Sequence, residues 1–571
     1  MRRAAITTAC LSLPFLLAAC EGNPFAANDG DYAKRVALER LRDIPPSRLE
    51  EFKRPTPPTP QDAAAARLRF AALEKLDLPL EEARAQALRH NLDLKVALVN
   101  PTIAAQQVSL EEARFESAFT LRAAYSEIDA PTSSQLSAAQ SKNLTLIPGV
   151  RIPTRTGGQA VVRLPIQKNE NNNPFSTLNP AYSSDLEFSL SHELLRGAGR
   201  RANTAALRIA GYNLQATEAQ TKLEVIRQLA AVDRSYWRLF QARRELEVAQ
   251  QQYELATDQE ARAQRRVDSG LAAPIEVTRA QAGSADRLEA IIVAQNNVQF
   301  QQRELKRIIN IPGLTLDTQT MVVPASPPDP VEYVFDTSAL VKQALDNRME
   351  MLELELRLAA DAANIAFARN QTLPLLTLDY TYRVNGLGGS TQDSFHTLQR
   401  NRFEDWELGL TAEIPLGNEA ARSRLRSAIL ERIQRLSTKQ ARELAITQEV
   451  LNAVDAIDSG WQRVLAARQS VILNRRTLQA EQRQFDVGGS TSTNVLDAAT
   501  RLAEAEFAEA RALADYQIAQ VDLAFATGTL LGASKVTWSP EPEPSTGQGN
   551  PVEELPNSSA ADNTPTPPAQ P

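Results

Sequence analysis

Apolar positions follow two different periods along the chain, and each period predicts one kind of element. In long segments the apolar residues recur every three or four positions, as they do on one face of an α-helix. One such run has the spacing of a coiled-coil seam and consists of Val450, Val454, Ile457, Trp461 and Val464. In four short segments apolar and polar residues alternate, which is typical of a β-strand with two unlike faces. The pattern predicts a mainly helical chain that carries a small sheet.

The alternating segments are 119–125, 185–191, 376–383 and 405–413. Strands of about 8–10 residues with this pattern suit a barrel with lipid outside and water inside. The same alternation is typical of a soluble antiparallel sheet packed on a core. The predicted helices already pair with one another and leave no element to cover such a sheet, which favours the membrane. About eight strands are needed to close a barrel, and open edges are not tolerated in lipid, so several chains would have to build it together.

The chain contains two copies of one unit. Residues 264–281 align without a gap with residues 482–499, and residues 113–125 align with 368–380. The offset between the copies changes by about 35 residues inside the segment 125–185, which is therefore longer in the first copy. Because this segment is rich in Asn, Pro, Gly and Ser, we expect an exposed loop there. It also holds a candidate strand–turn–strand from Val150 to Leu164.

Each copy predicts the same order of elements. A helix of about 37 residues (78–114 and 334–370) precedes two strands, and a very long helix follows (about 194–265 and 418–485). A tight Gly turn then leads to another shorter helix (275–310 and 493–530). The two shorter helices together match the long one, which would extend roughly 100 Å. Stacked end to end, they would run antiparallel beside it.

Composition and charge restrict the classes of function. The chain has 571 residues, 5% aromatic residues and a formal net charge of −7, so a basic nucleic-acid-binding face is not expected. After the first 20 residues no run approaches 18 apolar residues, and we expect no transmembrane helix. His90, His192 and His396 show no metal-ligand spacing, and no Ser/His/Asp or Cys/His arrangement is present. The sequence therefore predicts no enzyme, no cofactor and no metal site.

The N-terminus has the features of an export signal. Arg2 and Arg3 precede a short apolar stretch, and Leu17-Ala18-Ala19-Cys20 resembles a bacterial lipobox, in which Cys20 becomes the lipidated first residue. Ordinary cleavage with an incidental Cys20 is the alternative. Glu21, by resemblance to such lipoproteins, implies sorting to the outer membrane. We predict these divisions: signal peptide 1–19, N-terminal extension 20–77, first repeat 78–310, linker 311–333, second repeat 334–530 and Pro-rich disordered tail 531–571.

Several motifs together carry a resemblance to a known family. They are RHNLDLKVA (89–97), ELLRGAGR (193–200), VDSGLAAPIEV (267–277), EIPLG (413–417) and FDVGGSTSTNVLDA (485–498). In these motifs and in its duplicated order, the chain resembles the outer membrane factor family, the TolC-like channels of efflux pumps and type I secretion systems. The resemblance implies a mainly α fold with membrane β: a homotrimer with four strands per chain, a twelve-stranded barrel in the outer membrane, and a long α-helical barrel in the periplasm.

The resemblance also implies a function and partners. The chain would be a passive, lipid-anchored exit duct, opened by a periplasmic adaptor and driven by an inner-membrane pump of the RND or ABC type. Its other partner would be outer-membrane lipid, with no nucleic acid, and the transported substrate would be set by the pump. A periplasmic coiled-coil lipoprotein that acts as a scaffold or spacer is the alternative, although it leaves the alternating strands unexplained.

Site residues follow from the resemblance position by position. Asn494 and Asp497 match a pair of acidic residues that ring the pore at its narrowest point, and Glu276 occupies the matching place in the first copy. Phe485 and Ser490 stand where relatives carry a Tyr and an Arg that latch the closed state, and neither can make those bonds. The two Gly turns are candidate docking points for the adaptor and comprise Val267, Asp268, Ser269, Gly270, Leu271, Val487, Gly488, Gly489 and Ser490.

Overall fold

The computed structural model describes residues 74–132 and 137–536. These residues belong to one compact unit, Leu73–Pro571. The predicted signal peptide, the lipidation of Cys20 and almost all of the predicted tail lie outside the described residues. The boundaries predicted for the two repeats stay predictions.

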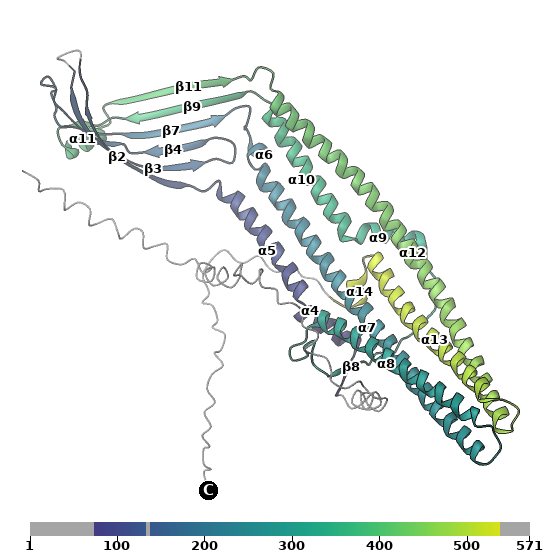
Figure 1. Ribbon diagram of the computed structural model, residues 1–571. Coiled ribbons are helices and arrows are strands. Elements are labelled where there is room, and N and C mark those ends of the chain that lie inside the picture. The colour runs from purple at the N-terminus through teal and green to yellow at the C-terminus, as the bar shows by residue number, and fades with distance from the viewer. Residues whose placement is uncertain (1–73, 133–136, 537–571) are drawn as a thin grey trace, which may run out of the picture. The chain divides into compact units, whose positions relative to one another are not determined.

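Two very long helices dominate the described residues (Figure 1). Helix α7 (Ala205–Asp268) has 64 residues and α12 (Glu419–Asp486) has 68, so each extends about 100 Å. The shorter helices are α4 (Leu80–His90), α5 (Leu92–Ala113), α8 (Ile275–Ile309), α9 (Thr337–Asn347), α10 (Met349–Gln371) and α13 (Ser492–Ala526). One-turn or otherwise brief helices complete the set: α6 (Arg200–Asn203), α11 (Thr391–Gln399) and α14 (Leu530–Ala533).

The shorter helices cover the long ones in two tiers. Helices α5 and α8 pack along different parts of α7, while α10 and α13 pack along different parts of α12. Helix α7 also contacts α10 and α13, so the first repeat packs directly on the second. The largest fully buried side chains include Tyr236, Leu229 and Leu239 of α7 and Tyr516 of α13. One hydrophobic cluster joins the two repeats and consists of Leu94 of α5, Val225, Ile226, Leu229 and Ala230 of α7, Val521 of α13 and Leu530 of α14.

The first helix of each repeat is interrupted, which the sequence pattern did not predict. The continuous helix expected over 78–114 breaks at Asn91, and the one expected over 334–370 breaks at Arg348. Both residues have extended backbone, with ψ of 127° and 130°. At the first break, Oδ1 of Asn91 accepts a hydrogen bond from the Leu94 N–H (2.8 Å) and its Nδ2 donates to the Ile308 carbonyl (2.9 Å). These bonds replace the helical hydrogen bonds that the break removes.

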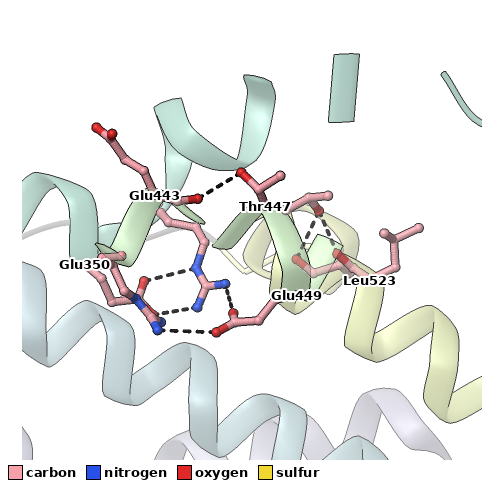
Figure 2. A network of polar contacts seen from close by, with 9 residues as sticks. Glu350, Glu443, Thr447, Glu449 and Leu523 are labelled. Carbon is pink, nitrogen blue, oxygen red and sulfur yellow. Dashed lines mark hydrogen bonds and ion pairs between the residues drawn. The ribbon is translucent and has the colours of Figure 1, made fainter. Parts of the chain in front are cut away.

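At the second break, four charged side chains join α10 to α12. The Arg348 guanidinium donates to Glu350 (2.6 Å) and to Glu449, while Arg442 donates to the same two carboxylates at 2.9 and 3.3 Å. Figure 2 shows Glu350 and Glu449 converging on these cations. The Arg348 guanidinium also lies 5.4 Å from the ring centre of Phe525 on α13. The Arg348 side chain at the break therefore contacts three helices of the second repeat, α10, α12 and α13.

Burial by itself raises the pKa of Glu350, but the hydrogen bonds and charge of Arg348, with a contribution from Arg442, outweigh it. The net effect holds the pKa of Glu350 below its ordinary value of 4.5. A carboxyl with a depressed pKa adds stability above its unfolded-state pKa, and this stability is lost as the pH falls through the folded-state pKa.

The strands form a sheet at the end of the long helices remote from the α7–α8 and α12–α13 turns (Figure 1). Its long strands are β2 (Ala118–Asp129), β3 (Gln140–Pro153), β7 (Leu186–Glu193), β9 (Leu375–Val384) and β11 (Glu404–Glu413). Shorter strands are β4 (Gln159–Arg163), β5 (Ile166–Asn171), β6 (Ala181–Ser184) and β10 (Leu387–Gly388). A separate parallel pair joins β1 (Lys75–Leu78) to β8 (Met321–Pro324).

The sheet differs from the expected four strands per chain. Strand β2 pairs with β3, β3 pairs with β4, and only β4 pairs with β7. The segment expected to be an exposed loop thus forms a hairpin inside the sheet, and its predicted strand–turn–strand from Val150 to Leu164 is confirmed. Pro148 and Gly149 lie inside β3, and Asn169 and Asn171 lie inside β5, so residues typical of loops hid these strands in the composition.

In the described part of the chain, no helix is both long and apolar enough to cross a membrane.

Replacing Arg348 with Ala should destabilise the second repeat by about 3 kcal/mol, because it leaves a buried carboxylate short of its partner. The thermal unfolding midpoint, followed by circular dichroism, measures the effect. Arg357→Ala is the matched control, since Arg357 pairs with Glu353 on the same helix but its side chain is 41% exposed. Equal shifts for the two variants would contradict a structural role for the buried network.

Acid should lower the thermal unfolding midpoint of the wild-type protein more than that of the Glu350→Gln variant. As the pH falls through the folded-state pKa of Glu350, which lies below the ordinary value of 4.5, Glu350 takes up a proton and its contribution to stability disappears. The Gln variant has no such proton to bind, so its unfolding midpoint should depend less on pH in this range. Parallel pH profiles for the two proteins would count against the depressed pKa.

Candidate functional site at the helix–helix turns

The two Gly turns are built alike. At the end of α7 the Gly270 N–H donates to the Val267 carbonyl (2.9 Å) and the Leu271 N–H to the Arg266 carbonyl (2.8 Å). At the end of α12 the Gly488 N–H donates to the Phe485 carbonyl (3.0 Å) and the Gly489 N–H to the Gln484 carbonyl (2.8 Å). This is the Schellman arrangement of a helix C-terminus. Gly270 and Gly488 have φ of 72° and 83°, a region that side chains disfavour, which explains glycine at both positions.

Phe485 packs into a small core beneath the second turn. It is 4% exposed and belongs to one cluster with Val471, Leu478, Val495, Ala498, Ala499, Leu502 and Ala505. Residues of α12 and α13 thus meet directly behind the turn, and the cluster fixes the angle at which the chain reverses.

Arg266 of the first repeat clamps Phe485 of the second. Its guanidinium carbon lies 4.6 Å from the centre of the Phe485 ring, and its Nη1 donates to the Phe485 carbonyl oxygen. Arg262, one turn earlier, forms an ion pair with Asp486 at 3.7 Å. Two arginines at the end of α7 therefore hold the end of α12. Arg266 is not among the site residues predicted from the sequence, although it lies in the segment 264–281 that aligns between the two repeats.

Glu276 also bridges the two turns. Its Oε2 accepts a hydrogen bond from the Ser492 N–H at the start of α13 (3.3 Å), and its Oε1 accepts from Arg279 (2.8 Å). The side chain is 17% exposed. A carboxylate at a helix N-terminus is stabilised by the free N–H groups there. Structurally, Glu276 joins the first turn to the second.

Asn494 and Asp497 lie apart from these contacts. Both are exposed and lie one helical turn apart on α13. The Asn494 N–H donates to the Thr491 hydroxyl (3.4 Å), which caps α13. Asn494 and Asp497 lie on one exposed stretch of α13, and Glu276 contacts Ser492, two residues before Asn494. Their predicted place in a pore ring stays a prediction.

Ser490 is held within the second repeat. Its hydroxyl donates to Glu481 (2.7 Å) and accepts a hydrogen bond from the Asn494 amide (3.2 Å). Its side chain therefore fixes the last residues of the turn against both helices, whereas Phe485 is held by the first repeat.

The turns themselves present apolar side chains. Val487 is 85% exposed and Leu271 is 71% exposed. Gly270 has open space where a side chain would begin. Among the predicted docking residues, Asp268 and Ser269 are exposed as well, while Val267 and Ser490 are half-buried. Two rigid turns with exposed apolar tips offer a surface for a protein partner, and docking there stays a prediction.

Other chemistry is sparse near the turns. A cavity of about 30 Å³ between α7, α8, α12 and α13 is lined in part by Gln252, Gln259 and Arg287, which gives room for about one water molecule. Within residues 74–132 and 137–536, no group of His, Cys, Asp and Glu side chains could hold a metal ion.

Comparison with known proteins adds the family context. The family model described as outer membrane efflux protein matches residues 160–310 and 340–529, more than half of the chain. Outer membrane protein TolC of Vibrio cholerae is 25% identical over 307 residues, covering 52% of this chain and 67% of that protein. The pyoverdine export outer membrane protein OpmQ of Pseudomonas putida is 26% identical over 373 residues, covering 63% and 72% respectively.

Solved structures show the same fold. The CmeC outer membrane channel of Campylobacter jejuni superposes with a TM-score of 0.59 at 16% identity, covering 79% of this chain and 86% of that one. The open state of the MtrE outer membrane channel of Neisseria gonorrhoeae gives 0.57 at 17% identity, covering 79% and 89%. The mainly helical fold with a strand-bearing end is therefore shared with such channels. Each of the two matched segments of the family model contains one of the turns.

Replacing Arg266 with Ala should loosen the second turn. The variant loses a cation–π contact and a hydrogen bond, together worth about 1–2 kcal/mol. Amide hydrogen exchange over residues 485–491 should rise roughly tenfold, while exchange over 266–271 changes little because those bonds are local. Arg265→Ala is the control, since Arg265 is exposed. Equal exchange in both variants would show that the clamp does not hold the turn.

Proposed function

The chain belongs to the outer membrane efflux protein family, and on this premise we propose that it is a passive exit duct of a tripartite efflux pump or a type I secretion system. Members of the family are channels of the outer membrane rather than enzymes, and we propose no catalytic role for this chain. The observation that carries the proposal is the family match across both repeats. The sheet attached to helices about 100 Å long supports it, because these elements suit a conduit through a membrane and a compartment beside it.

A homotrimer accounts for apolar surface on the outer helices. Contacts run from α5 to α7, α10 and α12 in turn, which leaves α5 and α12 at the two edges. Both edge helices carry exposed apolar residues at helical spacing: Leu92, Val96, Val99, Ile103 and Leu110 on α5, and Leu430, Ile433, Leu436, Leu444 and Leu451 on α12. An α5 edge packed on the α12 edge of a second copy would bury both stripes as in a coiled coil.

The partners follow from the same premise. The turns at 267–271 and 487–490 are the proposed docking points for a periplasmic adaptor, which in turn would connect the duct to an inner-membrane pump of the RND or ABC type. A lipid on Cys20 would anchor the chain to the outer membrane. The pyoverdine named for OpmQ belongs to that protein, and the cargo of this chain would be set by its pump.

The pore constriction is proposed at the turns. Three copies of Asp497, with Asn494 one turn away, would place three carboxylates around the axis and attract cations. Phe485 lacks the hydroxyl of a tyrosine latch and Ser490 lacks a positive charge. The contacts that hold the two turns of one chain together are instead those of Arg266 with Phe485, Arg262 with Asp486 and Glu276 with Ser492.

Channel activity is tested with the detergent-solubilised full-length protein. The proposal expects a trimer by light scattering and discrete conductance steps in a planar lipid bilayer. A monomer that gives no conductance would overturn it.

Asp497→Ala should weaken block of the channel by multivalent cations at least tenfold, because it removes the charge of the proposed ring. Block is measured as the concentration of hexamminecobalt(III) that halves the bilayer current. Asp286→Ala is the control, since Asp286 is an exposed carboxylate on α8 outside the proposed constriction. Unchanged block in the Asp497 variant would remove that residue from the ring.

A further inference from the structure

The hairpin inserted in the first repeat occupies the middle of the sheet. Strand β3 pairs with β2 over twelve residue pairs, from Ala118–Arg151 to Asp129–Gln140. On its other side β3 pairs first with β4 and then with β5, which follow each other in the chain. Strands β4 and β5 are thus two parts of one bent strand that covers most of β3, and β4 pairs in turn with β7. In the part of the sheet that borders the helices the order is β2, β3, β4, β7, β9 and β11, while β5, β6 and β10 continue the sheet at its far end (Figure 1).

The hairpin continues the apolar face of its neighbours in register. Residues directly opposite in antiparallel strands lie on the same face. One such row crosses all six strands and consists of Phe119, Val150, Val162, Phe188, Tyr382 and Trp406. A second row continues from the hairpin and consists of Ile152, Ala160, Leu190, Tyr380 and Leu408. An insertion that served as an exposed loop would not need to match its neighbours in this way.

The opposite face is polar across the same strands. Arg163 of the hairpin forms an ion pair with Glu187 (3.5 Å), Glu187 with Arg383 (3.0 Å), and Arg383 with Asp405 (3.8 Å). These four residues are opposite one another in register on β4, β7, β9 and β11. The hairpin therefore has the two unlike faces that are typical of a membrane β-strand, one apolar and one charged.

Both edges of this six-stranded sheet are open. Among the described residues, β2 pairs only with β3 and β11 only with β9. Every neighbouring pair along the order is antiparallel, so β2 and β11 run in opposite directions. A second copy can consequently place its β2 beside β11 as one more antiparallel pair. Phe119, Leu121 and Tyr125 on one edge and Trp406, Leu408 and Leu410 on the other would then continue the apolar face.

We propose that residues 146–166 are a membrane-embedded hairpin, bounded by the apolar pair Leu146–Ile166, so that each chain contributes six strands and three chains close an eighteen-stranded barrel in place of the family's twelve. The inference rests on the proposed function, namely a trimeric outer-membrane duct. The partner at each edge is a second copy of the chain, and the partner of the apolar face is outer-membrane lipid.

The width of the helical part fits this number of strands. Twelve helices from three chains, spaced about 10 Å apart, enclose a circle about 38 Å across. Eighteen strands spaced about 4.8 Å apart and tilted by about 40° enclose about 36 Å, whereas twelve at the same tilt enclose about 24 Å. The added hairpin lets the barrel match the helical duct without extreme tilt, and it keeps the exit as wide as the passage that leads to it.

Lipid contact of the hairpin is tested with single cysteines that carry a fluorophore, in full-length protein reconstituted in vesicles. Both native cysteines lie within the first 20 residues. Val150→Cys and Val162→Cys labels should be quenched by brominated lipid at least twofold more strongly than labels at Arg151→Cys and Arg163→Cys, which lie on the polar face. Leu408→Cys and Glu407→Cys on β11 provide the reference pair.

The reference pair separates the two proposals. Lipid quenching at Leu408 without quenching at Val150 and Val162 would overturn the hairpin's place in the membrane and leave the duct intact. If lipid quenches the label at none of these three positions, the membrane sheet and the proposed function fail together.

Disulfide formation between copies tests the edges. Leu121→Cys on β2 is combined with Leu408→Cys, Leu410→Cys or Ala412→Cys on β11, and one combination should give cross-linked oligomers on a non-reducing gel. Leu146→Cys on β3, combined with the same three, should stay monomeric. Cross-linking through β3 in place of β2 would overturn the six-strand order and the count of eighteen.

Discussion

Unpaired backbone groups at the edges of the sheet constrain everything else in this protein. A strand edge in lipid leaves N–H and C=O groups without partners, and each such group costs several kcal/mol. Strands β2 and β11 have such edges among the described residues, and their outward faces are apolar. One chain cannot satisfy these groups, since its strands do not close on themselves. The proposed closure by identical chains would satisfy them, because β2 and β11 run in opposite directions.

The edge helices α5 and α12 also leave surface without a partner, but this surface is made of apolar side chains rather than backbone groups. Helix α5 directly precedes β2 in the chain, and α12 directly follows β11. Each of these helices carries exposed apolar residues that no described element covers. Water tolerates such stripes at a cost in free energy, whereas lipid does not tolerate an open strand edge. The sheet therefore sets the requirement for assembly, and the edge helices add buried area to it. At the far end, Arg266 and Glu276 tie the turn of one repeat to that of the other, so each chain brings both turns as one unit.

Much of the fold could be predicted because its periods are long and regular. The long helices and the alternating strands follow from apolar spacing alone, and the Gly turns from the aligned repeats. The helix breaks could not be predicted in this way. Asn91 breaks its helix because the Ile308 carbonyl and the Leu94 N–H are both within reach of its side chain, and Ile308 is more than two hundred residues away in sequence. Arg348 breaks its helix where Glu449 of α12 and Phe525 of α13 meet its guanidinium.

In the candidate site, too, some features could be predicted from the sequence and others depend on the tertiary structure. The sequence by itself determined that two Gly turns end two long helices, because a Schellman turn needs glycine and the repeat marks both positions. It also determined which strand faces are apolar, because alternation is a local property of the chain. Only the tertiary structure decided that Glu276 bonds to the Ser492 backbone and that Arg266 holds Phe485, since these contacts join residues more than two hundred positions apart. Only the tertiary structure, likewise, placed the hairpin between β2 and β7, because strand order and register depend on backbone hydrogen bonds between distant segments that no local period records.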